Sequence, residues 1–141
     1  MSITINRSID VEDAIRTALD PYMTAYCPPL PESFTVPCIL VQATGGDTDA
    51  TASGKGKVDS FVVTIDSRAN EESDALEALR TAVAIITETK DAGYAHAEVN
   101  SLYSWGVDPV RPDLAMCSAA LVVTAHRETI TIEGGNTNGD S

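Results

Sequence analysis

The side chains best suited to acid–base chemistry stand near the end of the sequence. His126, Arg127 and Glu128 are consecutive, and the other histidine of the chain is His96. A histidine next to a carboxylate can serve as a general acid or base near neutral pH. Neither histidine belongs to a recognisable nucleophile or metal-binding motif, and no carboxylate among the many in the chain is marked out as a partner. The triplet is therefore more typical of a solvated strand end than of a catalytic centre.

The three cysteines, Cys27, Cys38 and Cys117, are odd in number and widely spaced. Such spacing predicts neither a disulfide framework nor a zinc site. Cys38 and Cys117 lie in apolar stretches, which predicts buried and unreactive thiols, whereas Cys27 stands beside two prolines and is the candidate for exposure. We therefore expect no catalytic residue, no cofactor and no bound metal.

A glycine-rich segment at residues 45–56 invites two ligand-binding interpretations. Residues 54–57 partly match a phosphate-binding loop, but Asp49 stands where its first glycine is needed and Gly56 replaces the hydroxyl residue that holds magnesium. Residues 47–51 begin like a calcium loop, but alanine and valine occupy the positions of its required glycine and bidentate glutamate. Neither ligand is expected, and the length of the segment indicates a functional or disordered loop.

The single tryptophan, Trp105, stands close to Asp108 and Pro109 in a turn-rich connection. Together these residues suggest a ligand pocket. A lone tryptophan at a strand end is more often packed under a loop or is an interface anchor, and we retain Trp105 as a candidate anchor.

Length and charge limit the classes of partner. The chain has 141 residues, which suits one domain of ordinary size. It carries 21 acidic against 9 basic side chains, a formal charge of −12. This balance argues against a grip on nucleic acid or on anionic lipid, since both need clustered Lys and Arg. With 43% hydrophobic but only 5% aromatic residues, the chain can build a core from Val, Ile, Leu and Ala.

Compartment signals are few. Residues 1–30 lack a basic start followed by an apolar run, so no signal peptide is expected. No stretch approaches the roughly 18 apolar residues that a membrane-spanning helix needs. We expect synthesis in a reducing cytoplasm.

The first half of the chain predicts one helix and two strands. Apolar residues recur at helical spacing over residues 10–19, with Ser8 or Asp10 as the cap. A proline-rich stretch at residues 22–37 predicts an extended crossing. The apolar run 38–43 predicts a strand covered on both faces, and the alternation over residues 58–66 predicts a half-buried strand.

The second half predicts a longer helix and two or three strands. Residues 71–87 carry an apolar stripe, with Asn70 as the expected cap. Two strands are expected over residues 94–105 and 116–126, and a short edge strand over residues 129–133. Residues 134–141 are expected to form a flexible tail.

This order, helix, two strands, helix, two strands, predicts an α+β fold. We expect a single domain over residues 1–133, with a mostly antiparallel sheet of four to five strands, two helices packed on one face and a long loop at residues 45–56. The other face of the sheet has no cover in a single subunit, which favours self-association.

Several stretches together resemble the tail terminator (tail completion) proteins of long-tailed bacteriophages. They are the first helix, the crossing into Pro-Cys-Ile-Leu-Val-Gln at residues 37–42, the strand 62–66, the Ala- and Leu-rich helix 72–83 and the two late strands. The resemblance covers residues 8–130 in the order and spacing of elements, and no single motif in it is diagnostic.

The resemblance implies a small structural subunit of the virion that catalyses nothing and assembles into a ring, usually a hexamer. Such a ring caps the tail tube, stops its polymerisation and offers its other face to the neck of the capsid. The long loop of such proteins commonly reaches a neighbouring subunit, the tube or the lumen. Here that role falls to residues 45–56, with the candidate interaction residues Gly45, Gly46, Asp47, Asp49, Lys55 and Lys57.

The acid surplus fits this role, because a negative channel wall repels DNA phosphates and lets the genome slide through the lumen without specific binding. Three alternatives remain open. The first, in the same structural class, is another phage neck protein that closes the head or joins head and tail. The chain also fits a small α/β enzyme or ligand-binding domain using His126, Glu128 and the Trp105 loop, or a monomeric adaptor whose acidic helix at residues 71–80 binds a basic partner.

Overall fold

A computed structural model describes residues 1–49 and 58–134 of the chain. The main sheet has five strands in the order β2-β3-β4-β6-β5, and only the β2–β3 pair is parallel. The strands are β2 (Ala25–Tyr26), β3 (Cys38–Asp49), β4 (Val58–Ala69), β5 (His96–Val107) and β6 (Ala115–His126).

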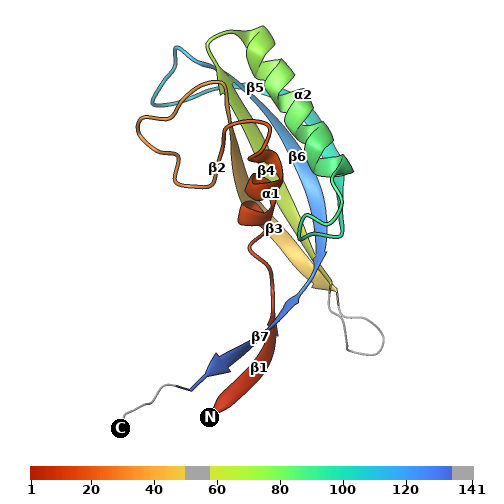
Figure 1. Cartoon of the computed structure of the whole chain (residues 1–141). Coiled ribbons are helices and arrows are strands. Elements are labelled where there is room, and N and C mark those ends of the chain that lie inside the picture. Colours follow the sequence, from red (N-terminus) through yellow and green to blue (C-terminus); the bar gives the residue numbers. More distant parts are fainter. Residues whose placement is uncertain (50–57, 135–141) are drawn as a thin grey trace.

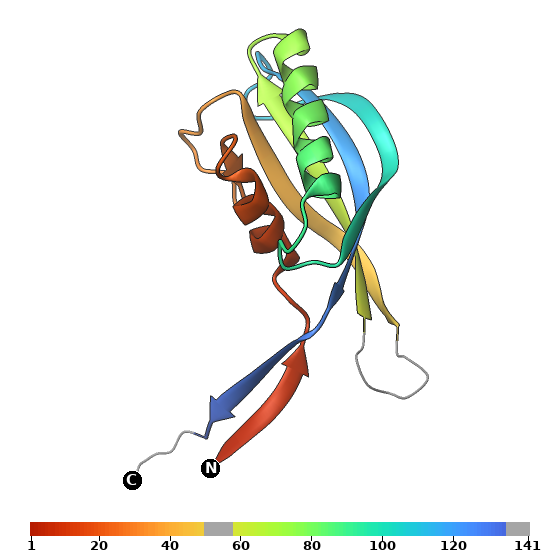
Figure 2. The ribbon, with the colours of Figure 1, turned by 45° about the vertical axis from the view of Figure 1, so that its right-hand side comes forward.

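Two helices, α1 (Val11–Leu19) and α2 (Glu72–Glu88), cover one face of this sheet (Figures 1 and 2). Asp10 caps α1, because its carboxylate accepts a hydrogen bond from the backbone N–H of Asp13 at 3.1 Å. The helices and the sheet are called the body below. The predicted α+β class, with a mostly antiparallel sheet and both helices on one face, is confirmed.

The core lies between the helices and the inward-facing side chains of the two central strands. Val63 and Ile65 of β4 and Leu121 and Val123 of β6 are fully buried, and they pack with the apolar stripe of α2. The alternate residues of the same strands are only half-buried, because they point to the other face of the sheet. The first four residues of β3, 38–41, are all buried, as the apolar run there predicted.

Outside the body, β1 (Ser2–Arg7) and β7 (Glu128–Glu133) form an antiparallel two-stranded sheet, called the ribbon below. Figures 1 and 2 show the ribbon projecting from the lower end of the body, with the N-terminus at its outer end. The sequence analysis did not predict β1. It placed residues 129–133 at an edge of the main sheet, whereas β7 pairs with β1.

The loop predicted at residues 45–56 begins too early. Gly45, Gly46 and Asp47 belong to β3, where they pair with β4. A β-bulge between Ala43 and Gly45 shifts the register of this pairing by one residue. Gly46 lies so close to β4 that a Cβ there would meet the backbone oxygen of Ser60 at 2.2 Å, which explains why glycine extends this strand.

The N-cap residue of α2 is Glu71, not Asn70, and its side chain makes no capping hydrogen bond. Lys55 and Lys57, with the rest of residues 50–57, lie outside the described residues, as do residues 135–141 of the expected tail. In the part of the chain that the structure describes, neither helix is long and apolar enough to cross a membrane.

Candidate interaction site

The ribbon has one apolar and one polar face. Its register pairs Ile3 with Ile132 and Ile5 with Ile130. Because side chains alternate along a strand and paired residues share a face, these four isoleucines lie on one side. We call them the isoleucine face.

The opposite side of the ribbon is polar and bonded within itself. The hydroxyl groups of Thr4 and Thr131 lie 3.2 Å apart, and the hydroxyl of Thr129 donates to the side-chain oxygen of Asn6 at 2.6 Å. The ribbon is therefore amphipathic, which is the pattern of a sheet that packs one face against other apolar residues.

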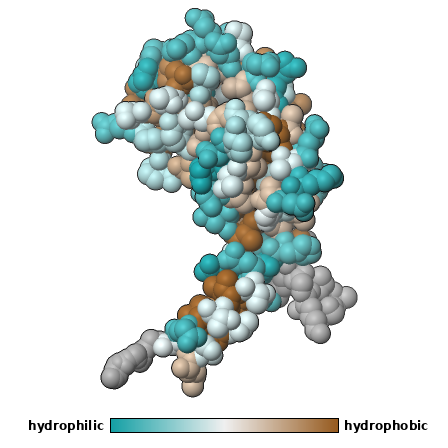
Figure 3. Space-filling view, viewed as in Figure 1, coloured by the Kyte–Doolittle hydropathy of each residue, from teal (hydrophilic) through white to brown (hydrophobic). Residues whose placement is uncertain are grey.

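Among the described residues, nothing covers the outer half of the isoleucine face. Ile3 is 55% exposed and Ile132 43% exposed, whereas Ile5 and Ile130, nearer the body, are half-buried. Figure 3 shows hydrophobic residues on the surface of the ribbon, apart from the body. A two-stranded ribbon is at best marginally stable by itself in water, so an apolar face of this kind needs a partner surface.

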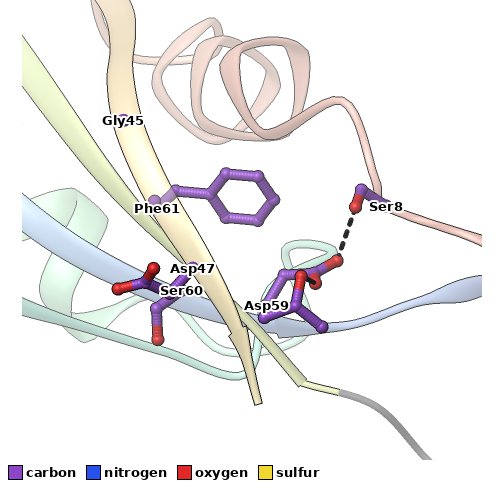
Figure 4. A pocket seen from close by; sticks show the side chains of 8 residues that line it. Ser8, Gly45, Asp47, Asp59, Ser60 and Phe61 are labelled. Atoms are coloured by element: carbon purple, nitrogen blue, oxygen red, sulfur yellow. Dashed lines mark hydrogen bonds between the residues drawn. The ribbon is translucent and has the colours of Figure 1, made fainter. Parts of the chain in front are cut away.

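The root of the ribbon is fixed to the body by Asp59, a residue of β4 whose side chain points inward and is 3% exposed. Ser8 follows β1 and donates to Asp59 Oδ2 at 2.7 Å, the bond drawn in Figure 4. Thr48 of β3 donates to Oδ1 at 2.6 Å, and the Nε atom of Arg127 lies 3.2 Å from Oδ2. One carboxylate thus holds both connections of the ribbon, at Ser8 and Arg127, against the β3–β4 pair.

Burial raises the pKa of the Asp59 carboxyl group. Hydrogen bonds from Ser8, Thr48 and Arg127, with the positive charge of Arg127, outweigh that effect and hold the pKa below its usual value. Asp59 is therefore ionised at neutral pH, in the form that accepts all three hydrogen bonds. Asp59 is not among the predicted site residues, although an acid at an inward position of the alternating strand 58–66 is a signal visible in the sequence.

Three of the predicted interaction residues lie beside this root. Gly45, Gly46 and Asp47 line an open hollow of about 460 Å³ together with Ser8, Thr48, Asp59, Ser60 and Phe61 (Figure 4). Asp49 ends β3. The structure therefore brings half of the predicted set to the ribbon, as residues of a strand.

Trp105 lies on β5, opposite Cys117 in the register, and 48% of it is exposed. Within the described residues β5 pairs only with β6, so its other edge is open. The exposure suits the predicted role of an interface anchor. Leu102, Tyr103 and Val107 are exposed on the same strand.

The pocket suggested for Trp105 forms without it. Asp108 instead meets Arg68, whose Nε lies 2.6 Å from Asp108 Oδ2, and both side chains are buried. Asp108 Oδ1 also accepts the backbone N–H groups of Val110 and Arg111, which fixes the turn. A hollow of about 480 Å³ beside this ion pair is lined mainly by residues 30–34 and 108–111.

The residues of the enzyme hypothesis do not converge. His126 is exposed at the end of β6, and Glu128 pairs with Arg7 on the ribbon. Trp105 lies opposite Cys117, nine residues along β6 from His126, a separation of roughly 30 Å at about 3.3 Å per residue. These side chains therefore do not form one site.

Cys38 and Cys117 are buried, as predicted, and Cys27 is partly exposed. Burial raises the pKa of the Cys38 thiol to about 11 and also raises that of Cys117, so both thiols stay protonated at neutral pH. Among residues 1–49 and 58–134 no three His, Cys, Asp or Glu side chains cluster in a way that would hold a metal ion.

Protein-family models give no match to this sequence, and neither do curated protein sequences.

The role of Asp59 gives the first testable prediction. Asp59→Asn removes the charge that faces Arg127, and we expect it to lower the free energy of unfolding by about 1–3 kcal/mol. Because the pKa of Asp59 is lower in the folded than in the unfolded chain, its stabilisation is fully present above the unfolded value, near 4, and is lost as the pH falls through the folded value.

Urea denaturation at a series of pH values measures both effects. The difference between wild type and Asp59→Asn should be largest near pH 7 and shrink in acid. Asp47→Asn is the matched control, because Asp47 is an exposed carboxylate of the same hollow. Equal losses in the two variants would show that Asp59 does not hold the ribbon root.

Proposed function

We propose that this chain is a structural virion protein, the tail terminator of a long-tailed bacteriophage. In this role copies form a ring, a hexamer as the resemblance implies, that caps the tail tube and stops its growth. The observation that supports the proposal most is the ribbon, whose isoleucine face lies outside the body and is exposed at Ile3 and Ile132. A subunit with an apolar projection is completed by contact with another chain, as the subunits of a ring are.

Two other features agree with this function. The body has the order of elements on which the resemblance to tail terminators rests. The charge of −12 of the full chain is repeated in every copy, so a ring is strongly negative, and phage DNA can pass through its lumen without being held. The partners in this proposal are further copies of the chain, the major tail tube protein on one side and a neck protein on the other.

The test uses the full chain and tail tubes from the phage that encodes it. Native mass spectrometry and negative-stain imaging should detect a closed ring, alone or at tube ends, and capped tubes should no longer elongate when tube subunits are added. A chain that leaves tube ends free and tube growth unchanged would contradict the proposal. Binding to the capsid connector in place of the tube end would favour the alternative, a head-closure or head–tail joining protein.

A further inference from the structure

The described residues carry two exposed apolar surfaces without net charge. One is the isoleucine face of the ribbon, which ends at its root in the mutually neutralising pair of Arg7 and Glu128. The other, called the β5 patch, consists of five exposed residues of one strand: Val99, Leu102, Tyr103, Trp105 and Val107. Residues 99–107 contain no charged side chain, and neither do residues 1–6 or 129–132, in a chain of which 21% is charged.

The β5 patch is exposed because β5 is an edge strand with an irregular course. Its pairing with β6 shifts register between Val99 and Ser101 and again between Ser101 and Ser104. These irregularities interrupt the alternation only between Val99 and Ser104, yet every residue from 98 to 107 is exposed, including Trp105, whose register partner Cys117 points into the core. An edge of this kind offers apolar side chains rather than a regular row of backbone groups.

The ribbon of a chain does not reach the patch of the same chain. Trp105 lies opposite Cys117, and the ribbon begins after His126, so most of β6 separates them. The ribbon itself is about 20 Å long, at about 3.3 Å for each of its six paired residues, and it projects away from the body (Figures 1 and 2). Contact between these two surfaces therefore requires two copies.

We propose that the isoleucine face of one copy packs on the β5 patch of a second copy. Charge identifies the partner as another copy of this chain. Copies that each carry −12 repel one another, so they approach most closely where neither surface carries net charge, and the described residues of one chain offer two such surfaces, one on the ribbon and one on β5.

This contact is head-to-tail, because each copy uses a different surface toward each of its two neighbours. Repeated head-to-tail contacts generate a ring when the rotation closes, and an open filament when it does not. The inference deepens the proposed function and rests on it for closure of the ring. The contact itself requires only the two surfaces.

A mixing experiment with two variants tests the contact. Ile3→Glu places a charge on the isoleucine face and leaves the β5 patch intact, whereas Trp105→Glu does the reverse. Both positions are exposed, so the body keeps its core. Thr4→Glu, on the polar face of the ribbon, and Ser104→Glu, an exposed neighbour of Trp105, are the matched controls.

Sedimentation velocity of the full-length chains is the measurement. We expect wild type and both controls to assemble, and each of the two variants alone to associate at least about 30-fold more weakly. An equimolar mixture of Ile3→Glu and Trp105→Glu should form a dimer with one copy of each and nothing larger, because one intact ribbon then meets one intact patch.

Other outcomes overturn the inference. Normal assembly of Trp105→Glu alone would indicate that ribbons pack on each other. A mixture that stays monomeric, or a wild type that stays monomeric up to about 1 mM, would show that ribbon and patch do not bind.

These failures are distinguishable from failure of the proposed function. If Trp105→Glu rings still cap tubes, the contact is wrong and the terminator function stands. If mixed dimers form but wild type caps no tube, the contact stands and the terminator function is wrong.

Discussion

Leu79→Asp is expected to abolish folded, soluble protein. Leu79 is fully buried in the middle of α2, where it packs in the core between the helices and the sheet. An aspartate there removes an apolar side chain and places a carboxylate among apolar neighbours with no basic partner. The cost of burying an unpaired charge, added to the lost packing of about 2–5 kcal/mol, reaches the whole net stability of a typical domain, about 5–15 kcal/mol.

Circular dichroism and gel filtration of the soluble fraction measure this outcome. Thr81→Asp is the control, because it adds the same charge two residues away on the exposed side of α2. The control should stay folded with a stability within about 0.5 kcal/mol of wild type. A Leu79→Asp chain that unfolds cooperatively, like wild type, would mean that the inward face of α2 is assigned wrongly.

That face was predicted from the sequence, and local patterns explain why. In α2 the apolar residues recur at helical spacing, and Ala75, Leu79, Ala82 and Ile86 are all fully buried. The strands β4 and β6 alternate just as clearly. Where one face of an element meets a large core, periodicity alone identifies both the element and its buried side.

The ribbon was missed although its pattern is visible. Ile-Thr-Ile occurs at residues 3–5 and again at residues 130–132. Each run is too short to indicate more than an edge strand, and the two are separated by nearly the whole chain. Only the pairing of Ile3 with Ile132 turns two short alternations into one amphipathic surface, and such long-range pairing cannot be read from a local pattern.

The β3 extension was missed for a related reason. Glycine and aspartate disfavour strands, so Gly45, Gly46 and Asp47 were interpreted as loop. Their partners on β4 override that preference, because Gly46 allows the two backbones to approach closely. Local propensity is a weak guide where a long partner strand is available.

Charged side chains show a similar limit. Glu12 and Arg16 are four residues apart on α1, a spacing that favours an ion pair between them. Arg16 instead bonds to Asp13 at 2.8 Å, and the carboxylate of Glu12 accepts the backbone N–H of Ala43 at 2.8 Å. Glu12 thus accepts a hydrogen bond from a backbone N–H group of β3. Side-chain spacing along a helix does not reveal a partner of this kind.

The candidate site was predicted in part. Trp105 is exposed on an edge strand, as an interface anchor must be, and Gly45 to Asp47 lie beside the ribbon root. Asp59 and Arg68 were not predicted, because a charged residue at a buried strand position is recognisable only when its partners, here from distant segments, are known.

The buried pair of Arg68 and Asp108 leads to the second large prediction. Asp108→Asn is expected to lower the free energy of unfolding by about 3–5 kcal/mol, because it leaves the Arg68 charge buried without a counter-charge. The guanidinium group of Arg68 is already short of hydrogen-bond acceptors, since its Nη1 atom is buried and makes no hydrogen bond among the described residues. The asparagine oxygen can still accept the backbone N–H groups of Val110 and Arg111, so the turn is preserved.

Adding Arg68→Met to Asp108→Asn separates charge from packing. The double variant removes both charges and keeps the acceptor of the turn, so it should recover most of the stability that Asp108→Asn loses.

Burial raises the pKa of Asp108, but the hydrogen bonds from Arg68 and from the backbone of the turn outweigh that effect and lower the pKa. The advantage of wild type over Asp108→Asn is therefore present at neutral pH and shrinks in acid, as the pH falls from the unfolded value near 4 through the folded one. Urea denaturation of the three chains at pH 7 and in acid measures this, and equal instability of single and double variants would show that the turn, rather than the buried charge, requires Asp108.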